Sequence, residues 1–374
     1  MGEWQCREAH RGRRIPLSRH PNRARVIEPT RTRAPRGHRY SGEVNELDYG
    51  LLEALTLRPR APWSQVSTAL GVSAATAARR WEALRSQGLA WMSAFPGPRY
   101  APGSRIVEIH IACTPHRRKD VAQALAEHPD MLSISAMVGD WDLVINTQTN
   151  AGIAGIEALL DDPIWSHPGI RGRSVAQAVR LFSQGNDWRI GALAPAQTAE
   201  LLGARTARNE VVSDSAREHM TRLLHEDPRM SASSLAEALR TSVATVGRRL
   251  ETLLHEGAIS VRTEVAASVS GWSSGGYLYL DVPPRLLDAV GQYISHLPST
   301  RLSMGVLHSR WNLSTVFWLN RIEQLLDIEE TITSQFPEVR VVHRATRLRE
   351  IKRLGWLLDD DERVKSRVPI RFSA

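Results

Sequence analysis

The chain has 374 residues, which is enough for two to four domains of ordinary size. Its formal charge is +8, and residues 1–40 supply the whole excess with eleven arginines and three glutamates, so a nucleic-acid argument must rest on local charge. Two cysteines, no long apolar run and an arginine-for-lysine bias exclude a disulfide framework and a membrane span, and they favour a soluble protein of the bacterial cytoplasm, near the nucleoid.

Residues 1–43 form a basic segment that is rich in arginine and proline and poor in periodic apolar residues. This composition predicts disorder. Three interpretations stay open: an organelle transit peptide, a basic arm that seeks DNA, or translated sequence upstream of the true start. We infer no function from this segment.

Residues 44–98 are predicted to form a first helix-turn-helix domain. Leu47, Leu51 and Leu55 recur at helical spacing before Pro59, and a second short helix ends at Gly71. A third helix then begins after Ser73, a good N-cap residue. Two short helices joined through a glycine turn are typical of a helix-turn-helix.

The third helix separates its side chains as a DNA-recognition helix requires. Its packed face is predicted to hold Ala77, Trp81 and Leu84. The opposite side is predicted to present short polar and arginine side chains to DNA, with the outer arginines on phosphate: Ser73, Thr76, Arg79, Arg80 and Arg85. The alternative is an ordinary amphipathic helix whose arginines are solvated.

Residues 104–184 change from helical to strand periodicity. Strands and helices are expected in the order βαββαβ, which predicts a ferredoxin-like regulatory domain with one sheet face covered by helices. In the first strand Val107, Ile109 and Ile111 alternate with Glu108 and His110, which predicts a half-buried strand.

A tight hairpin connects the second and third of these strands. Its sequence is Gly139, Asp140, Trp141 and Asp142. The carboxylates could receive the ammonium group of an amino-acid effector, so these four residues are the predicted ligand site. The alternative is a β-turn with a packed tryptophan.

The second part of the chain repeats this pattern. A linker is expected over 185–212, a second helix-turn-helix over 213–262, a second ferredoxin-like domain over 270–352 and a C-terminal tail over 353–374. The segment from Arg240 matches the segment from Gly71, and it supplies the second set of predicted DNA-binding residues: Ser242, Thr245, Arg248 and Arg249. The fold class is therefore α+β, with two copies of a helix-turn-helix and ferredoxin-like pair.

The second hairpin differs from the first. It reads Ser309, Arg310, Trp311, Asn312 and Leu313, so the tryptophan and leucine are kept and the glycine and both carboxylates are lost. We therefore expect at most one hairpin of this kind to bind an effector.

These motifs, with the Gly-Asp-Trp-Asp hairpin, resemble the Lrp/AsnC (feast/famine) transcription regulators, over residues 45–184 and again 213–352. The resemblance implies a tandem form that binds double-stranded DNA, responds to an amino acid or similar molecule, and assembles into homo-oligomers. Two unlike recognition helices predict an asymmetric operator.

Two alternatives remain. Some enzymes that decarboxylate a haem precursor, siroheme decarboxylases, share this architecture and use His, Tyr and Arg near the second strand; here only His308 and Arg310 lie there. A sensor or scaffold that no longer binds DNA is the other. Because no catalytic, metal or cofactor motif stands out, we expect a protein that is not an enzyme.

Overall fold

The computed structural model describes residues 44–97, 104–185, 189–203, 210–272 and 274–371. The basic segment 1–43, with Cys6, lies outside the described residues. All described residues belong to one compact unit, Arg33–Ala374. None of the helices in these ranges is long and apolar enough to cross a membrane.

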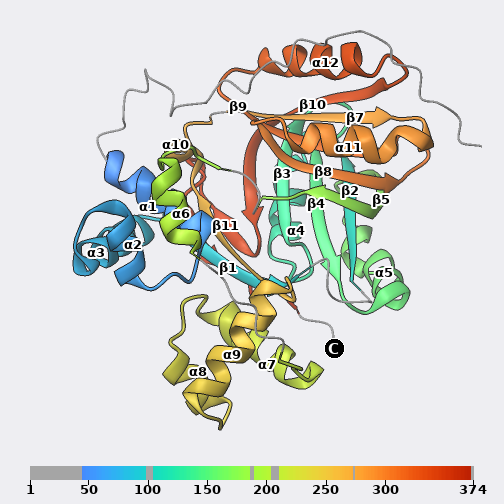
Figure 1. The fold of residues 1–374 in the computed structure, drawn as a ribbon. Coiled ribbons are helices and arrows are strands. Elements are labelled where there is room, and N and C mark those ends of the chain that lie inside the picture. Colours follow the sequence, from blue (N-terminus) through green and yellow to red (C-terminus); the bar gives the residue numbers. More distant parts are fainter. Residues whose placement is uncertain (1–43, 98–103, 186–188, 204–209, 273, 372–374) are drawn as a thin grey trace, which may run out of the picture. The chain divides into compact units, whose positions relative to one another are not determined.

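The first helical region contains α1 (Glu46–Leu57), α2 (Trp63–Leu70) and α3 (Ala74–Ser86) (Figure 1). Asn45 caps α1, and Gly71 ends α2 with φ at 68°, a conformation that glycine adopts without strain. Ala77, Trp81 and Leu84 are buried in the core of this region, as the helical spacing predicts.

The second helical region contains α7 (Asp214–Glu226), α8 (Ala232–Ala238) and α9 (Val243–His255). Its core includes Val246, Leu250 and Leu253, at the helix positions expected from the first region. A strand follows each third helix: β1 (Ala90–Pro96) and β6 (Ile259–Val265). These two strands pair with each other in antiparallel register, so they join the two helical regions. The short helix α10 (Ala267–Ser270) follows β6.

The rest of the chain forms a large antiparallel sheet with its helices. The first series is β2 (Arg105–Cys113), α4 (Arg118–Ala126), β3 (Ser133–Val138), β4 (Leu143–Thr149), α5 (Gly152–Leu160), the 3-10 turn η1 (Pro163–Ser166) and β5 (Ile170–Ser183). The second series is β7 (Ser274–Asp281), η2 (Pro284–Leu286), α11 (Leu287–Ser295), β8 (Thr300–Leu307), β9 (Leu313–Leu319), α12 (Gln324–Gln335) and β10 (Arg340–Arg353).

The strands of both series close into a barrel. Their order is β10-β3-β4-β2-β5-β8-β9-β7, and β7 pairs back onto β10, while β5–β8 and β10–β3 join the first series to the second (Figure 1). One apolar cluster packs α4 and α5 against the first series, and another packs α11 and α12 against the second. A third cluster, with Met137, Tyr279 and Trp311, fills the space between the series.

Three expectations about the connections and the first strand are corrected. The segment 185–212 contains α6 (Pro195–Leu202), because Leu201 is buried in the core of the first helical region. The segment 353–374 contains β11 (Trp356–Leu358) and β12 (Val364–Arg367), which extend the sheet at its edge. Strand β2 is buried on both faces, not half-buried, because its polar face points toward the second series of strands.

Candidate functional site

Helix α3 presents Arg79 to solvent. Ser73 caps the helix, since its Oγ accepts a hydrogen bond from the Thr76 backbone N at 3.0 Å and lies 2.8 Å from Thr76 Oγ1. Arg79 is exposed and forms no ion pair among the residues that the structure describes. Ser73, Thr76 and Arg79 therefore line one accessible side of the helix, where bases or phosphates could be contacted.

Arg80 and Arg85 are already engaged in ion pairs. Arg80 donates through Nε to Asp48 Oδ1 at 2.8 Å and through Nη2 to Oδ2 of the same carboxylate, which is fully buried. Arg85 donates to both carboxylate oxygens of Glu82 on its own helix, at 2.9 and 2.6 Å. In this structure Arg80 holds α3 against α1, a role that the spacing of α3 alone did not reveal.

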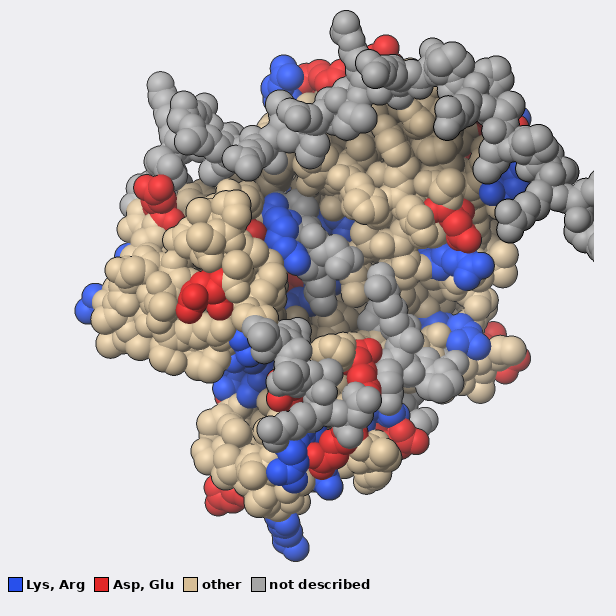
Figure 2. Space-filling model, viewed as in Figure 1, with Lys and Arg blue, Asp and Glu red and all other residues tan. Residues whose placement is uncertain are grey.

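Helix α9 shows the same cap and a different arginine environment. Ser242 Oγ accepts from the Thr245 backbone N at 3.1 Å. Arg248 Nε donates to Glu210 Oε2 at 2.9 Å, and Arg249 Nε lies 3.5 Å from Glu210 Oε1. One glutamate from the segment before α7 therefore neutralises part of the charge of the second predicted recognition helix. Figure 2 shows basic and acidic side chains interspersed over the described part of the visible face, without a single basic field.

The first hairpin uses its carboxylates for internal contacts. Asp142 Oδ2 accepts from the backbone N of Cys113 at 2.7 Å, which ties the hairpin to the end of β2. Asp140 Oδ2 lies 2.5 Å from His343 Nδ1 on β10, and its side chain is 66% exposed. Gly139 has φ at 153°, and a side chain there would meet Ala345. Of the predicted ligand residues, only Asp140 offers an exposed carboxylate.

The second hairpin is held in an equivalent way, by hydrogen bonds of a side-chain amide instead of a carboxylate. Asn312 accepts from the Val282 backbone N at 2.9 Å and donates to the Val282 carbonyl at 2.7 Å. Trp141 and Trp311 both lie near His110, with ring centroids 5.9 and 5.3 Å from its ring. The feature that both hairpins share is thus a tryptophan that packs near His110, between the two series of strands.

A buried polar group between β2 and β7 was not predicted as a functional site. Glu108 and His110 are fully buried, and His110 Nε2 lies 3.3 Å from Glu108 Oε1. Among the described atoms, neither ring nitrogen of His110, nor Glu108 Oε2, nor the Tyr279 hydroxyl forms a hydrogen bond. Burial raises the pKa of Tyr279 well above its usual value. The only sequence signal was the polar alternation of β2, which we interpreted as solvent exposure.

His308 directly follows the last residue of β8. Its ring stacks on Trp311 with centroids 3.5 Å apart, and Nε2 lies 2.7 Å from Ser174 Oγ on β5. Burial lowers its pKa to about 4, so the ring is neutral at pH 7. In the barrel interior, Glu108, His110 and Tyr279 lie close together, where they could exchange protons with a bound molecule.

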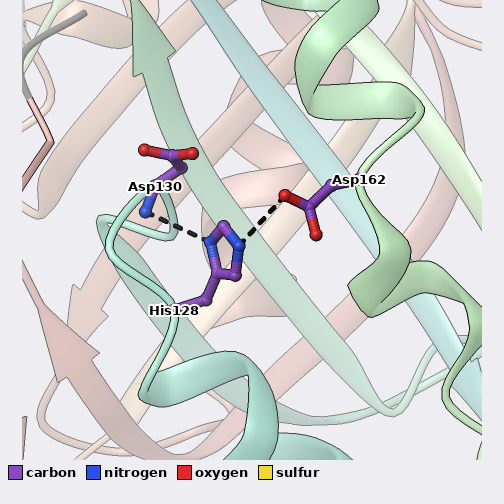
Figure 3. A group of neighbouring side chains, drawn as sticks. All are labelled: His128, Asp130 and Asp162. Carbon is purple, nitrogen blue, oxygen red and sulfur yellow. Dashed lines mark hydrogen bonds and ion pairs between the residues drawn. The ribbon is translucent and has the colours of Figure 1, made fainter.

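One other group has the composition of a metal site, and Figure 3 shows its members, His128, Asp130 and Asp162. His128 Nδ1 accepts from the Asp130 backbone N at 3.3 Å, and Nε2 lies 3.1 Å from Asp162 Oδ2. Asp162 also caps η1, and Arg371 lies 3.5 Å from Asp130. Both ring nitrogens of His128 already have polar partners, and the Arg371 side chain supplies a cation near Asp130. These contacts are explained as structural interactions without a metal ion.

Residues 44–85 match the AsnC-type helix-turn-helix domain, which confirms the resemblance to Lrp/AsnC regulators for this part of the chain. No curated protein matches the chain by sequence. Among solved structures, Escherichia coli AsnC is 20% identical and covers 37% of this chain and 93% of its own, with a TM-score of 0.30.

Two crystal structures of the siroheme decarboxylase NirDL match over a longer range. Each is 16% identical and covers 83% of this chain and 93% of that chain, with TM-scores of 0.53, and of 0.52 for the complex with an iron-uroporphyrin III analogue. This similarity shows a shared fold. The expectation that the chain is not an enzyme is contradicted by this finding, because the fold that it matches over most of its length is that of an enzyme.

Proposed function

We propose, on the premise that residues 44–85 form an AsnC-type helix-turn-helix domain, that this chain is a sequence-specific DNA-binding transcription regulator. The observation that carries the proposal is the exposed side of α3, where Ser73, Thr76 and Arg79 stand clear of the packed core. A helix of this kind fits the major groove, and arginine is the side chain that most often contacts guanine there.

The second half supports a tandem arrangement. Helices α7, α8 and α9 follow the order of α1, α2 and α3, and the β7 to β10 series follows the order of the β2 to β5 series. We propose that the chain is a fusion of two units and that α9 reads a second half-site. Assembly into larger homo-oligomers and association with the nucleoid remain predictions.

The two recognition helices are not equivalent in this proposal. Arg79 on α3 has no ion-pair partner in the described part of the chain, whereas Arg248 and Arg249 share Glu210. Helix α3 therefore contributes more to sequence-specific DNA affinity. Helix α9 contributes fully to this affinity only when Glu210 is displaced from Arg248 and Arg249. The operator is accordingly expected to have one strong and one weak half-site.

DNA binding is tested by fluorescence anisotropy of the full chain against DNA from upstream of its own gene and a scrambled duplex, over a salt series. We expect tighter binding to the upstream DNA, with a loss of about tenfold or more in Arg79→Gln. Arg340→Gln, whose side chain is 79% exposed on β10, is the matched control. Equal affinity for both duplexes, or full affinity in Arg79→Gln, would contradict the proposal.

The hairpin remains a proposed contact for an effector, restricted to Asp140 and Trp141. Asp142 binds the Cys113 backbone, and Gly139 serves the turn. An amine that reached Asp140 would compete with His343 for the same carboxylate.

A second candidate function is favoured by the barrel interior. The fold shared with siroheme decarboxylase over 83% of the chain coincides with buried Glu108, His110 and Tyr279, whose polar atoms lack hydrogen bonds in the described structure. Decarboxylation replaces a carbon–carboxylate bond with a carbon–hydrogen bond, so it releases CO2 and consumes a proton. His110 or Tyr279 could deliver that proton.

This activity is tested by incubating the full chain with siroheme under anaerobic conditions and following the loss of CO2 by mass spectrometry. We expect turnover that disappears in His110→Ala and persists in the exposed-histidine control His219→Ala. Unchanged siroheme with the folded wild-type chain would eliminate this second candidate and leave the regulator proposal untouched.

A further inference from the structure

Two arginines connect the two helical regions in a reciprocal way. Arg60 lies between α1 and α2, and Arg229 lies between α7 and α8. The offset in the sequence that takes Gly71 to Arg240 also takes Arg60 to Arg229, so the two arginines occupy equivalent positions in the two copies of the helical pattern. Each side chain binds the loop that carries the other arginine.

Each guanidinium group donates hydrogen bonds to the two residues that flank the other arginine. Arg60 Nη1 and Nη2 donate to the carbonyls directly before and after Arg229, the second at 2.6 Å. Arg229 Nη1 and Nη2 donate to the carbonyls directly before and after Arg60, at 2.5 and 2.8 Å. We call these four hydrogen bonds the arginine clasp, and its acceptors are the carbonyls of Pro59, Ala61, Pro228 and Met230.

The clasp brings two like charges together in half-buried positions. Burial lowers the pKa of Arg60, and burial together with the charge of Arg60 lowers the pKa of Arg229 to about 10, while the Asp227 carboxylate opposes both shifts. Both groups therefore stay charged at pH 7. Their acceptor carbonyls lie just beyond the C-terminal ends of α1 and α7, where the helix dipole favours a cation.

Arg229 is held by a further contact. Its guanidinium group lies over the Trp63 ring, 4.1 Å from the ring centroid. The position equivalent to Trp63 in the second region is Ala232, which has no ring to offer Arg60. Arg229 is therefore the more firmly held half of the clasp.

The clasp is one of two connections between the helical regions, and the other is an exchange of strands. Strand β1, which follows α3, contributes Ala94 to the core of the second region, and β6, which follows α9, contributes Val265 to the core of the first. Thr263 on β6 also donates to the Leu55 carbonyl of α1 at 2.7 Å. A two-stranded ribbon alone leaves freedom to twist, and a second attachment at the loops removes that freedom.

We propose that Arg60 and Arg229 are positioning residues that fix the distance and angle between α3 and α9, and that they thereby set the spacing of the two half-sites that the chain reads. In helix-turn-helix proteins this spacing follows from the geometry of the paired recognition helices. The consequence for DNA rests on the proposed function, whereas the fixed arrangement of the two helical regions does not.

The fixed arrangement is measured without DNA. Spin labels at Ser86→Cys and His255→Cys, in a Cys6→Ser background, report the distance between α3 and α9 by pulsed electron paramagnetic resonance. Ser86 and His255 are exposed, and they are the last residues of the two helices. Burial raises the pKa of native Cys113 to about 11, so its protonated thiol reacts slowly with the label.

We expect one narrow distance distribution in the labelled chain and a broader or shifted one after Arg60→Gln/Arg229→Gln. The charge-matched control Arg285→Gln/Arg340→Gln removes two arginines whose side chains are 66% and 79% exposed, and it should keep the narrow distribution. A broad distribution with the clasp intact, or an unchanged one in the folded double variant, would overturn the inference.

Two milder variants keep the inference falsifiable if the double variant does not fold. Arg60→Gln removes the half of the clasp that lacks a stacked ring. Arg229→Lys keeps the charge but replaces the planar, forked donor with a single ammonium group. Each should broaden the distribution, and an unchanged distribution in both would overturn the inference as well.

The consequence for DNA is measured with duplexes whose two half-sites, obtained by selection from random DNA, are moved apart in single base-pair steps over about one helical turn. We expect the wild-type chain to prefer one spacing by about tenfold or more, and Arg60→Gln/Arg229→Gln to bind all spacings within about threefold of one another. An unchanged preference in the double variant would overturn the role in spacing. Absence of specific DNA binding, with a narrow distance distribution that the double variant loses, would overturn the proposed function and leave the clasp in place.

Discussion

At the scale of single residues, the partner of a side chain decides its role more than its position in a motif. Arg79 and Arg80 are neighbours in the sequence of α3, but Arg79 is exposed and Arg80 is paired with buried Asp48. The sequence pattern predicted DNA contacts for both. It could not show that Asp48, 32 residues earlier, takes Arg80 for the packing of α3 on α1.

Arg79→Gln and Arg80→Gln should therefore affect different properties, DNA affinity and stability respectively. Arg79→Gln should reduce DNA affinity, and it should reduce the salt dependence of binding by about one released counterion. Its free energy of unfolding should stay within about 0.5 kcal/mol of the wild-type value. The second should lower the free energy of unfolding by about 2 kcal/mol, because buried Asp48 loses its partner while Arg80 is partly solvated. Urea unfolding and anisotropy measure the two quantities, and equal stability losses would contradict the assignment.

His225 should make stability depend on pH. Burial lowers its pKa to about 4, and its ring is held as the neutral form, since Nδ1 donates to the Ala94 carbonyl and Nε2 accepts from the Ile370 backbone N. The unfolded chain binds this proton near pH 6.5, so stability contributed by the neutral ring is present above that pH and is lost as pH falls toward 4.

The expected loss from His225 is up to about 3 kcal/mol between pH 6.5 and 4, from a shift of about 2.5 units. Chemical unfolding at a series of pH values measures it. His225→Gln should reduce the dependence of the free energy of unfolding on pH. The control His219→Gln changes an exposed residue of the same helix and should leave this pH dependence unchanged. A profile that is identical in wild type and His225→Gln would show that the ring does not titrate in this way.

At the scale of elements, the helices of the two helix-turn-helix regions were predictable, whereas α6 and the strand faces were not. Serine caps, glycine stops and helical spacing located α3 and α9, because these signals are local. The burial of Glu108 and His110 depends on strands far away in the sequence, as the hydrogen bond from Ser314, 206 residues later, to Glu108 shows. No pattern within β2 could reveal that.

The hydrogen bonds that the Asp142 and Asn312 side chains form in the two hairpins can be compared by a matched pair of substitutions. Asp142 only accepts a hydrogen bond from Cys113, so Asp142→Asn should change the free energy of unfolding by less than about 0.5 kcal/mol. Asn312 both accepts and donates, so Asn312→Asp should cost about 1–3 kcal/mol, because a carboxylate oxygen would face the Val282 carbonyl. Thermal and urea unfolding compare the two variants, and a larger loss in Asp142→Asn would contradict this structural role of the hydrogen bonds and favour a charge-dependent role.

At the scale of the whole molecule, the closed barrel and the β1–β6 pair place the two unlike helices α3 and α9, the proposed recognition helices, in one chain. A dimeric regulator brings two identical helices to DNA and reads a palindrome. Among the described residues Arg79 has no ion-pair partner, whereas Arg248 pairs with Glu210, so the chain is expected to read two different half-sites. Glu210→Gln should therefore strengthen the contribution of α9, seen as tighter binding of the weaker half-site.

Whether this chain reads DNA sequence with two unlike helices is best measured by selection of binding sites from a random DNA library with the full chain, because no knowledge of the target gene is needed. We expect an enriched, asymmetric sequence of two half-sites about one helical turn apart, with the stronger half-site lost in Arg79→Gln. Failure to enrich any sequence, or a perfect palindrome that Arg79→Gln still selects, would contradict it.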